Sequence, residues 1–576
     1  MNDTSGFTLD LLDYLAFGAY FVILCLIGFW VGRKERTSSD DYFLAGRSLP
    51  WYVVGGSFIA SNISTEHFIG MIGGAFVYGI CVATSEWLNI GSFTLLIWFF
   101  IPFLLTAKVF TTPEFLERRF NFTLRQFFAV VTVISNVVAF LAAVLYGGGL
   151  ALHKLFGWDL WFAIIALGVV AGSWAIYGGL MSVAWTDFFT VIVMIAGGLM
   201  VTLLGLYMLS ADSHSLIQGF KVMIQRNQAH DGIWATVVAR NAQQIVHADH
   251  YNRLAVIQPV THQVVPWPYL IFGIFSVSIW YNVLNQFMIQ RVLGAKNMYH
   301  ARMGIVLAGY MKIFMPVIVV LPGLILFARF PEVLNLPWDQ VQPEADKGYV
   351  AMLQMLVPVG LRGLFLAALF GAIQSTVNSV LNSTATIFTL DIYKRLIRRE
   401  ASEKHLVRMG IWSSVVILLI SIVLAGFVNR FEKSLFVYIQ SLYAFFAPPF
   451  AAVFLLGILF RRINALGAST AVILGFLLGI LMKIYVQSFA HPAWLEPYAM
   501  QAIINWGFCI LVCTGISLST ARPRPEQVTD ELTMNWARLN ILSDMGTRWY
   551  NSVVLWWFIF AFVICLLMLT FSGIYL

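Results

Sequence analysis

Charged residues are scarce in this chain. Asp, Glu, Lys and Arg make up 11% of its 576 residues, against about 25% in ordinary soluble domains. So few charges cannot cover the surface of a soluble globule, and the apolar content excludes an intrinsically disordered chain. Cysteine is rare as well. The five cysteines lie in apolar runs without a CxxC pair, so no disulfide framework outside the membrane is indicated.

Apolar residues dominate instead, at 60% of the chain with a mean hydropathy of +0.81. A bilayer-spanning helix needs about 20 apolar residues. We therefore expect an all-α polytopic protein of the cell (plasma or inner) membrane, with about 14 transmembrane helices in contact with the lipid bilayer. The expected spans are 15–32, 49–77, 80–106, 127–152, 160–179, 188–209, 269–289, 303–327, 363–390, 409–428, 435–460, 465–482, 498–518 and 553–576.

The basic residues predict one orientation. The formal net charge of +7 is explained by Lys and Arg at span ends, so binding to nucleic acid is not indicated. Arg33 directly follows the first expected span, and residues 394–408 after the ninth span are rich in Lys and Arg. The positive-inside rule places these segments in the cytoplasm, and both termini are then predicted outside.

Polar residues crowd the centre of the second expected span, which has the sequence GGSFIASNISTEHFIG over residues 55–70. Polar groups at this depth are expensive unless they face protein or a cavity. Small and polar residues suit a broken helix, whose freed carbonyls need partners, and such breaks bind ions and substrates in transporters with inverted repeats. Helix packing through small residues is the alternative, but it leaves Glu66 and His67 without a role.

Ionisable and hydroxyl residues recur in other spans. Glu86, Asp187 and Lys312 lie in or at the ends of apolar runs, where buried charges pair with each other or with a polar ligand. For Asp187 a helix N-cap and an ion-binding role both stay open. The ninth span is rich in Ser, Thr and Asn over 375–386. These oxygens suit a hard cation, and hydrogen bonding between helices is the alternative.

Several motifs occur in a family-like order. They are DYFLAGRSLPW at 41–51, ASNISTEHFIG at 60–70, SEW at 85–87, YGGLMSVAWTD at 177–187, PWP at 266–268, WYNVLNQFMIQRVLGAKNM at 280–298, LRGLFLAALF at 361–370, NSTATIFTLDIYK at 382–394 and YIQSLYAFFAPPFAAVFLLGILFRRIN at 438–464. As a set they resemble the sodium:solute symporter family, and specifically its sodium/glucose cotransporter branch.

The resemblance implies a leucine-transporter-like fold, with a core of two inverted five-helix repeats that contain broken helices. The repeats would cover about 49–210 and 267–460, joined by an extracellular loop at about 211–265 whose five histidines have no assigned role. Residues 1–48 would form an extra span and a cytoplasmic loop, and 461–576 three peripheral spans. The broken helices would be the second span and the seventh, near 278–286.

The resemblance also implies sodium as the coupling ion. The main-site ligands map onto the backbone carbonyls of Ala60, Ile63 and Ala372 and the hydroxyls of Ser375 and Thr376. Five neutral oxygens would hold a monovalent ion weakly enough to release it. A second family site centres on Asp187. Its accompanying hydroxyl position is Asn378 here, which leaves the second sodium open.

The sugar-contacting positions of the family map onto Asn62, His67, Glu86, Ser278, Tyr281, Lys312 and Gln440. Sugar hydroxyls donate and accept hydrogen bonds, and this set contains partners for both. Tyr281 maps to the inner gate, and Met71 and Phe436 map to the outer gate. Asn282 replaces a family Trp and Ser85 replaces an aromatic residue, so the substrate or the gating is expected to differ from that of glucose transporters.

The function implied is sodium-driven symport of a glucose- or galactose-like hexose by alternating access. Other solutes stay open: myo-inositol, a sialic acid, an amino acid or a monocarboxylate. Lys312 suits an acid, whereas Glu86 favours a neutral polyhydroxyl ligand. An intramembrane enzyme would need a nucleophile–base pair or a metal centre, and only His67 with Ser64 offers one, so we expect no enzyme. The oligomeric state stays open.

Overall fold

The structure is a computed structural model that describes residues 9–33, 38–341, 344–345, 357–428, 435–535 and 542–573. Within these ranges every regular element is a helix, apart from one backbone bridge between Leu49 and Ala295. The α-helices are α1 Leu11–Gly32, α2 Ser39–Leu44, α3 Trp51–Asn62, α4 Ile72–Tyr78, α5 Thr84–Trp87, α6 Asn89–Leu95, α7 Ile101–Ala107, α8 Thr112–Arg119, α9 Phe122–Ser135, α10 Ala142–Phe156, α11 Leu160–Leu209, α12 Leu216–Gln228, α13 Gly232–Val246, α14 Trp267–Gly273, α15 Gln286–Leu293, α16 Met298–Val319, α17 Leu321–Arg329, α19 Arg362–Ile387, α20 Glu403–Ala425, α21 Leu435–Leu459, α22 Ala465–Ser488, α23 Tyr498–Ser519 and α24 Val553–Thr570.

Short π-helical segments join several of these α-helices into longer helices. They are η2 Glu66–Met71, η4 Leu96–Phe100, η5 Asn136–Leu141, η7 Ile274–Ser278, η8 Trp280–Leu284 and η10 Phe388–Ile397. Extra residues per turn open the backbone hydrogen-bond ladder locally, and such turns occur frequently at functional sites. Three of them, η2, η7 and η8, lie in the two spans that the sequence predicts to be broken.

The described residues contain 12 helical segments long and apolar enough to cross a membrane. Two of them are long enough for two spans each. Residues 66–107 form a 42-residue segment, in which Gly79 has a φ of 78°. The 50-residue α11 is interrupted at Gly179, with a φ of 61°. A span takes about 20 residues; the number 14 stays a prediction.

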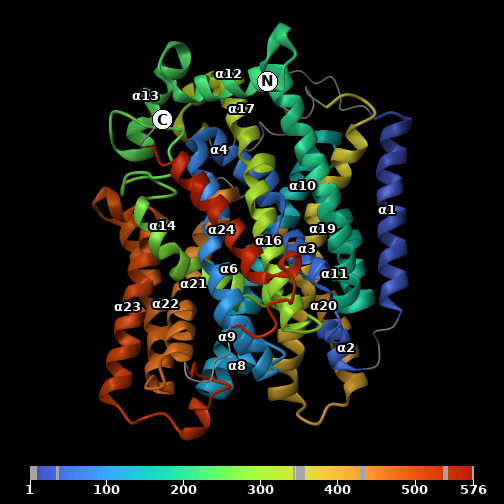
Figure 1. Cartoon of the computed structure of the whole chain (residues 1–576), viewed down its shortest axis with the longest axis vertical. Coiled ribbons are helices and arrows are strands. Elements are labelled where there is room, and N and C mark those ends of the chain that lie inside the picture. Colours follow the sequence, from blue (N-terminus) through green and yellow to red (C-terminus); the bar gives the residue numbers. More distant parts are fainter. Residues whose placement is uncertain are drawn as a thin grey trace.

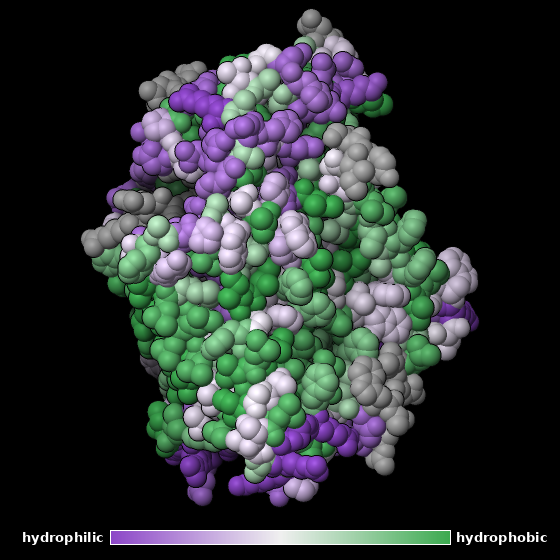
Figure 2. All heavy atoms as spheres, turned by 90° about the vertical axis from the view of Figure 1, so that its left-hand side faces the viewer, coloured by the Kyte–Doolittle hydropathy of each residue, from purple (hydrophilic) through white to green (hydrophobic). Residues whose placement is uncertain are grey.

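The surface has the pattern of a membrane protein. Figure 2 shows a broad belt of hydrophobic side chains between hydrophilic regions at the two ends of the molecule. Large apolar residues stand exposed on the outer helices, for example Trp30 of α1 and Leu511 of α23. The belt accounts for the low charge content, because lipid replaces water around these helices.

The helices form a central bundle with peripheral additions (Figure 1). α3 packs against α11, α16 and α19, while α21, α22 and α23 pack together on one side. α12 and α13 lie across one end, where α12 contacts α17 and α11. The start of α1 and the end of α24 lie at this same end, and α2 and α8 lie at the opposite end (Figure 1).

Both predicted helix breaks are present. α3 ends at Asn62, Ile63 is extended with a ψ of 119°, and helical structure resumes at Glu66. In the seventh span, η8 ends at Leu284, and Asn285 is extended before α15 begins. The break after Asn62 frees backbone carbonyls in the middle of the bundle, and these carbonyls form part of the site described next.

Candidate functional site

A buried cavity lies beside the break between α3 and η2. Its volume is about 50 Å³, enough for a few water molecules and far below the roughly 300–1,000 Å³ of pockets that hold organic ligands. All seven residues predicted to contact sugar line it, together with the predicted gate residue Met71. The full lining is Asn62, Glu66, His67, Met71, Ser85, Glu86, Leu88, Asn89, Tyr269, Val277, Ser278, Tyr281, Lys312, Gln440 and Tyr443.

A buried ion pair forms one wall of the cavity. Lys312 of α16 donates from Nζ to Oε2 of Glu86 in α5 at 2.6 Å, and both side chains are at most 5% exposed. His67 Nε2 lies 3.3 Å from the other carboxylate oxygen of Glu86. Charges at this depth are stable only when paired or hydrogen-bonded. The pairing therefore explains how one amine and one carboxylate can be kept inside the membrane.

Asn62 connects this ion pair to Tyr281. Lys312 also donates to Oδ1 of Asn62, and Nδ2 of Asn62 donates to the Tyr281 hydroxyl at 2.7 Å. The amide orientation follows from the ammonium group, which can only donate. A ligand that competes for Lys312 would therefore disturb the bond that holds the predicted inner gate.

Glu66 brings a second carboxylate to the cavity. Gln440 of α21 donates to its Oε1 at 2.9 Å, and the Tyr443 hydroxyl lies 3.4 Å from its Oε2. The sequence marked Glu66 as a polar residue inside a span but gave it no role in the site. Tyr443, Tyr269 and Asn89 were missed altogether, because a single aromatic or amide residue in an apolar run carries no distinguishing signal.

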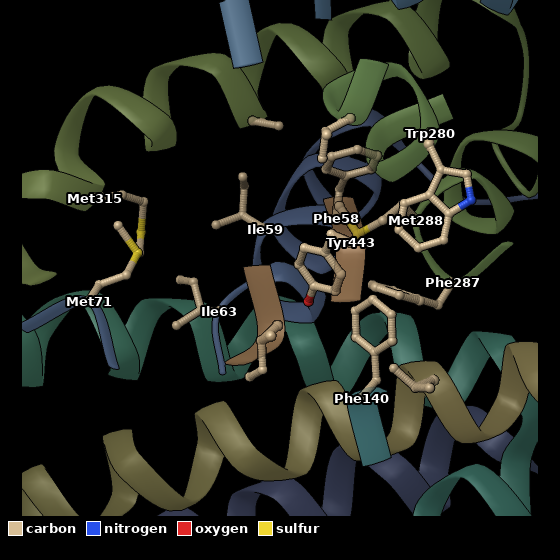
Figure 3. Packing of buried hydrophobic residues seen from close by; sticks show 14 of the residues in the cluster. Phe58, Ile59, Ile63, Met71, Phe140, Trp280, Phe287, Met288, Met315 and Tyr443 are labelled. Atoms are coloured by element: carbon tan, nitrogen blue, oxygen red, sulfur yellow. The ribbon is translucent and has the colours of Figure 1, made fainter. Parts of the chain in front are cut away.

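Aromatic rings from several helices pack together beside Tyr443, which lines the cavity (Figure 3). Phe140 stacks on Tyr443 with ring centroids 4.9 Å apart, and Phe287 meets Phe140 edge-on at 5.0 Å. Tyr281 lies against the same group, 5.4 Å from Tyr443. Phe140, Tyr281 and Tyr443 also line a small void together with Thr376 of α19, so the rings lie between the cavity and the oxygen cluster around α19.

That oxygen cluster brings all five predicted main-site sodium ligands together. The Ser375 hydroxyl donates to the carbonyl of Ala60 at 2.8 Å and to that of Ala372 at 3.2 Å. Thr376 Oγ1 donates to the carbonyl of Ile63 at 3.0 Å. Each hydroxyl can turn its hydrogen away and present a lone pair. The donor set of neutral oxygens fits a hard monovalent cation.

Asp187 lies within α11, which overturns one of its two interpretations. It is eight residues past the interruption at Gly179 and fully buried, so the N-cap interpretation is wrong. Its Oδ2 accepts hydrogen bonds from Ser57 at 2.8 Å, Ser61 at 3.2 Å and Ser379 at 3.3 Å. The carboxylate thus gathers hydroxyls from α3 and α19 around one point.

Arg291 of α15 accompanies Asp187. Its Nη2 lies 3.5 Å from Oδ2 of Asp187, and the arginine is also fully buried. A fixed cation therefore balances the carboxylate that the resemblance assigns to a second sodium. Asn378 stands where the family's second sodium site has a hydroxyl residue. Neither atom of its amide has a hydrogen-bond partner within the described structure. A second sodium site stays a prediction.

Of the two residues that differ from the family pattern, Ser85 and Asn282, one lines the cavity and the other does not. Ser85 lines the cavity beside Glu86. Asn282 points elsewhere, donating to Oδ1 of Asn89 at 2.6 Å and to the Ser92 hydroxyl at 2.9 Å. Phe436 lies within α21, but its side chain is outside the described part of the chain, so its predicted gate role stays a prediction.

Comparison with known proteins identifies the family. The profile of the sodium:solute symporter family matches residues 42–475. A sodium/glucose cotransporter of Vibrio parahaemolyticus is 33% identical over 92% of this chain and 96% of its own length. The sodium/myo-inositol cotransporter of Homo sapiens is 31% identical over 93% of this chain and 76% of its own length.

The fold also has a solved counterpart. A sodium-coupled sialic acid symporter, in a substrate-bound outward-open state, superposes with a TM-score of 0.70 at 20% identity. It covers 89% of this chain and 99% of its own. This likeness confirms the leucine-transporter-like fold class, and the family match confirms a transporter as opposed to an enzyme. The chain belongs to the sodium:solute symporter family.

Proposed function

We propose that the protein imports a sugar, a hexose of the glucose or galactose type, by symport with sodium through alternating access. One observation carries the proposal: all seven predicted sugar-contacting residues line one buried cavity beside the broken helix. Two relatives of this chain are named as sodium/glucose cotransporters, which supports the same substrate class.

The chemistry of the cavity suits a neutral polyhydroxyl ligand. Lys312 donates hydrogen bonds, the carboxylates of Glu66 and Glu86 accept them, and the amides of Asn62 and Gln440 do both. Each is already bonded to a neighbour, so a sugar hydroxyl must exchange with an existing partner. A cavity of about 50 Å³ also requires the surrounding helices to move apart before a hexose fits.

Coupling follows from the order of residues at the break. Ala60 and Ile63 contribute carbonyls to the sodium-binding oxygens, and Asn62 between them reaches the cavity. Sodium that fixes the backbone of residues 60–63 would therefore fix the position of Asn62. Because linkage is reciprocal, a sugar held by Asn62 strengthens sodium binding equally. Release of sodium to the cytoplasm then weakens the hold on the sugar.

Myo-inositol is the second candidate, since it is another neutral polyhydroxyl and since relatives named sodium/myo-inositol cotransporter are 31% identical. A sialic acid, an amino acid or a monocarboxylate brings a carboxylate close to Glu66 and Glu86, which disfavours these solutes.

Proteoliposome uptake separates these candidates. We expect labelled D-glucose or D-galactose to accumulate under an inward sodium gradient and not under an equal potassium gradient. Accumulation of myo-inositol without accumulation of either hexose would show that the substrate is a cyclitol and not a hexose. Equal uptake in sodium and potassium would contradict symport and indicate a passive pathway.

The orientation in the cell membrane is part of the same proposal. The start of α1 and the end of α24 lie at the end of the molecule where α12 and α13 lie (Figure 1). α8, with Arg118 and Arg119, lies at the opposite end. By the positive-inside rule the α8 end faces the cytoplasm, and both chain ends face outside.

A further inference from the structure

The outer end of α4 is held by an arginine from the loop at 211–265. Arg253 donates from Nη1 to the carbonyl of Val77 at 2.7 Å, and from Nη2 to those of Phe76 at 2.8 Å and Ala75 at 3.2 Å. Its guanidinium carbon lies 3.6 Å from the ring centroid of Phe327, and the residue is 1% exposed. These carbonyls belong to the last turn of α4, at the negative end of the helix dipole. The carbonyl of Ala75 also accepts from the N–H of Gly79, whereas carbonyls in a last turn in general need partners from outside the helix.

The backbone adds a second attachment at the same place. The N–H of Ile80 donates to the carbonyl of Arg253 at 2.8 Å. Gly79 makes this approach possible with a φ of 78°, and a Cβ there would lie 2.2 Å from the Arg253 carbonyl oxygen. Any other residue would force the loop and the helix end apart.

Tyr251 and His262 form a third attachment. The Tyr251 hydroxyl donates to the carbonyl of Tyr78, and His262 Nε2 lies 3.2 Å from that hydroxyl. His262 Nδ1 accepts from the backbone N–H groups of Val264 and Val265 at 3.1 and 3.0 Å, so the proton of the neutral ring is on Nε2. Burial lowers the pKa of His262 to about 3, so the ring keeps this form across the physiological pH range.

The helix held in this way leads directly to the cavity. α4 continues η2, and residues 66–78 form one half-helix that carries Glu66, His67 and Met71 into the lining. The same loop is fixed to α17 as well. Asn227 donates to the carbonyl of Leu324 at 3.0 Å and accepts from Arg253 Nε at 3.3 Å. The loop therefore ties the outer end of the half-helix to a neighbouring helix of the bundle.

We propose that Arg253 is a positioning residue for solute binding. With Tyr251 and Gly79 it makes the extracellular loop and the half-helix 66–78 one rigid unit, so that His67, Glu66 and Met71 keep their places in the cavity. The role in transport rests on the proposed function, whereas the mechanical link between loop and half-helix does not.

Two substitutions test the role, with a matched control in the same loop. Arg253→Gln keeps a hydrogen-bond donor but loses the charge and the two guanidinium nitrogens that donate to separate carbonyls. Arg253→Lys keeps the charge. Arg226 is the control, because it caps another outer helix end by donating to the carbonyl of Ala328 in α17 at 3.0 Å. We expect Arg253→Gln to raise the half-saturating sugar concentration at least about fivefold, because a hydrogen bond from a charged donor is lost. Arg253→Lys should recover part of this loss, and Arg226→Gln should leave the concentration unchanged.

A structural role alone gives a different pattern. If Arg253→Gln lowers the melting temperature in detergent but leaves the half-saturating concentration of the inserted protein unchanged, the positioning role is overturned. An equal rise in the Arg226→Gln variant would overturn it too, because the effect would then come from the loop as a whole.

A second measurement does not depend on the solute. Met71 is 2% exposed in the cavity wall. A Met71→Cys variant is labelled in intact cells with a membrane-impermeant maleimide, and the parent with its five native cysteines sets the background. We expect the labelling rate to rise when Arg253→Gln is added and not when Arg226→Gln is added. An unchanged rate with Arg253→Gln overturns the mechanical link. If the link is present but the parent takes up no sugar, only the proposed function fails.

Discussion

Replacing the buried pair of Lys312 and Glu86 separates a binding role from a structural one. In Lys312→Met, Glu86 loses its 2.6 Å partner while remaining at most 5% exposed, and it keeps His67 Nε2 at 3.3 Å. Breaking a buried pair from one side costs about 3–5 kcal/mol. In Glu86→Gln, Lys312 keeps its bond to Asn62, so the loss of stability should be smaller.

The double variant Lys312→Met/Glu86→Gln is the decisive member of the set. With both charges gone, no unpaired charge stays buried, so its melting temperature in detergent should return toward that of the parent. Sugar binding should not return. Each lost polar contact costs about 1–3 kcal/mol, more beside a charge, so sugar affinity should fall at least about tenfold in all three variants.

The assay compares melting temperature and equilibrium binding of the labelled sugar for the parent and the three variants. Sodium activation, measured in parallel, should change less than sugar affinity. A double variant that regains sugar affinity along with its melting temperature would refute the reasoning, because the pair would then only hold helices together.

Two further predictions concern the buried carboxylates Asp187 and Glu66. Asp187→Asn leaves Arg291 without its counter-charge, so we expect a lower melting temperature and altered sodium activation with little change in sugar affinity; unchanged melting temperature and Hill coefficient would contradict a role in coupling. Glu66→Gln keeps the shape but weakens acceptance from Gln440 and from sugar hydroxyls, so sugar affinity should fall about fivefold; equal affinity in parent and variant would exclude Glu66 from the site.

The break in the second span was predictable because its sequence violates the rule for lipid-exposed segments, whereas the break in the seventh span followed only from the family resemblance. Nine glycine or polar residues within 55–67 cannot all face hydrocarbon, and the break after Asn62 resolves the conflict. Lys312 and Glu86 were predictable for the same reason, since an isolated charge in a span needs a partner. That these two residues pair with each other, 226 positions apart, follows from the packing of α16 beside α5.

Asp187 shows where local patterns fail. The sequence predicts a sixth span that begins at 188, directly after Asp187, and therefore allows an N-cap there, whereas α11 already continues from its interruption at Gly179. In the structure, Ser57, Ser379 and Arg291 surround the carboxylate, and these residues come from helices distant in sequence. The stack of Phe140 on Tyr443 was equally invisible, because aromatic residues are common in every membrane span.

Sodium-driven accumulation in proteoliposomes, compared between the parent and Ser375→Ala/Thr376→Ala, tests the central claim most directly. These hydroxyls bond the carbonyls of Ala60 and Ile63 at the helix break. Without them only three of the five oxygens remain, too few for a dehydrated ion. We predict that the parent concentrates sugar under an inward sodium gradient and that the double variant inserts normally but does not. Equal sodium-dependent accumulation by the double variant would contradict the account.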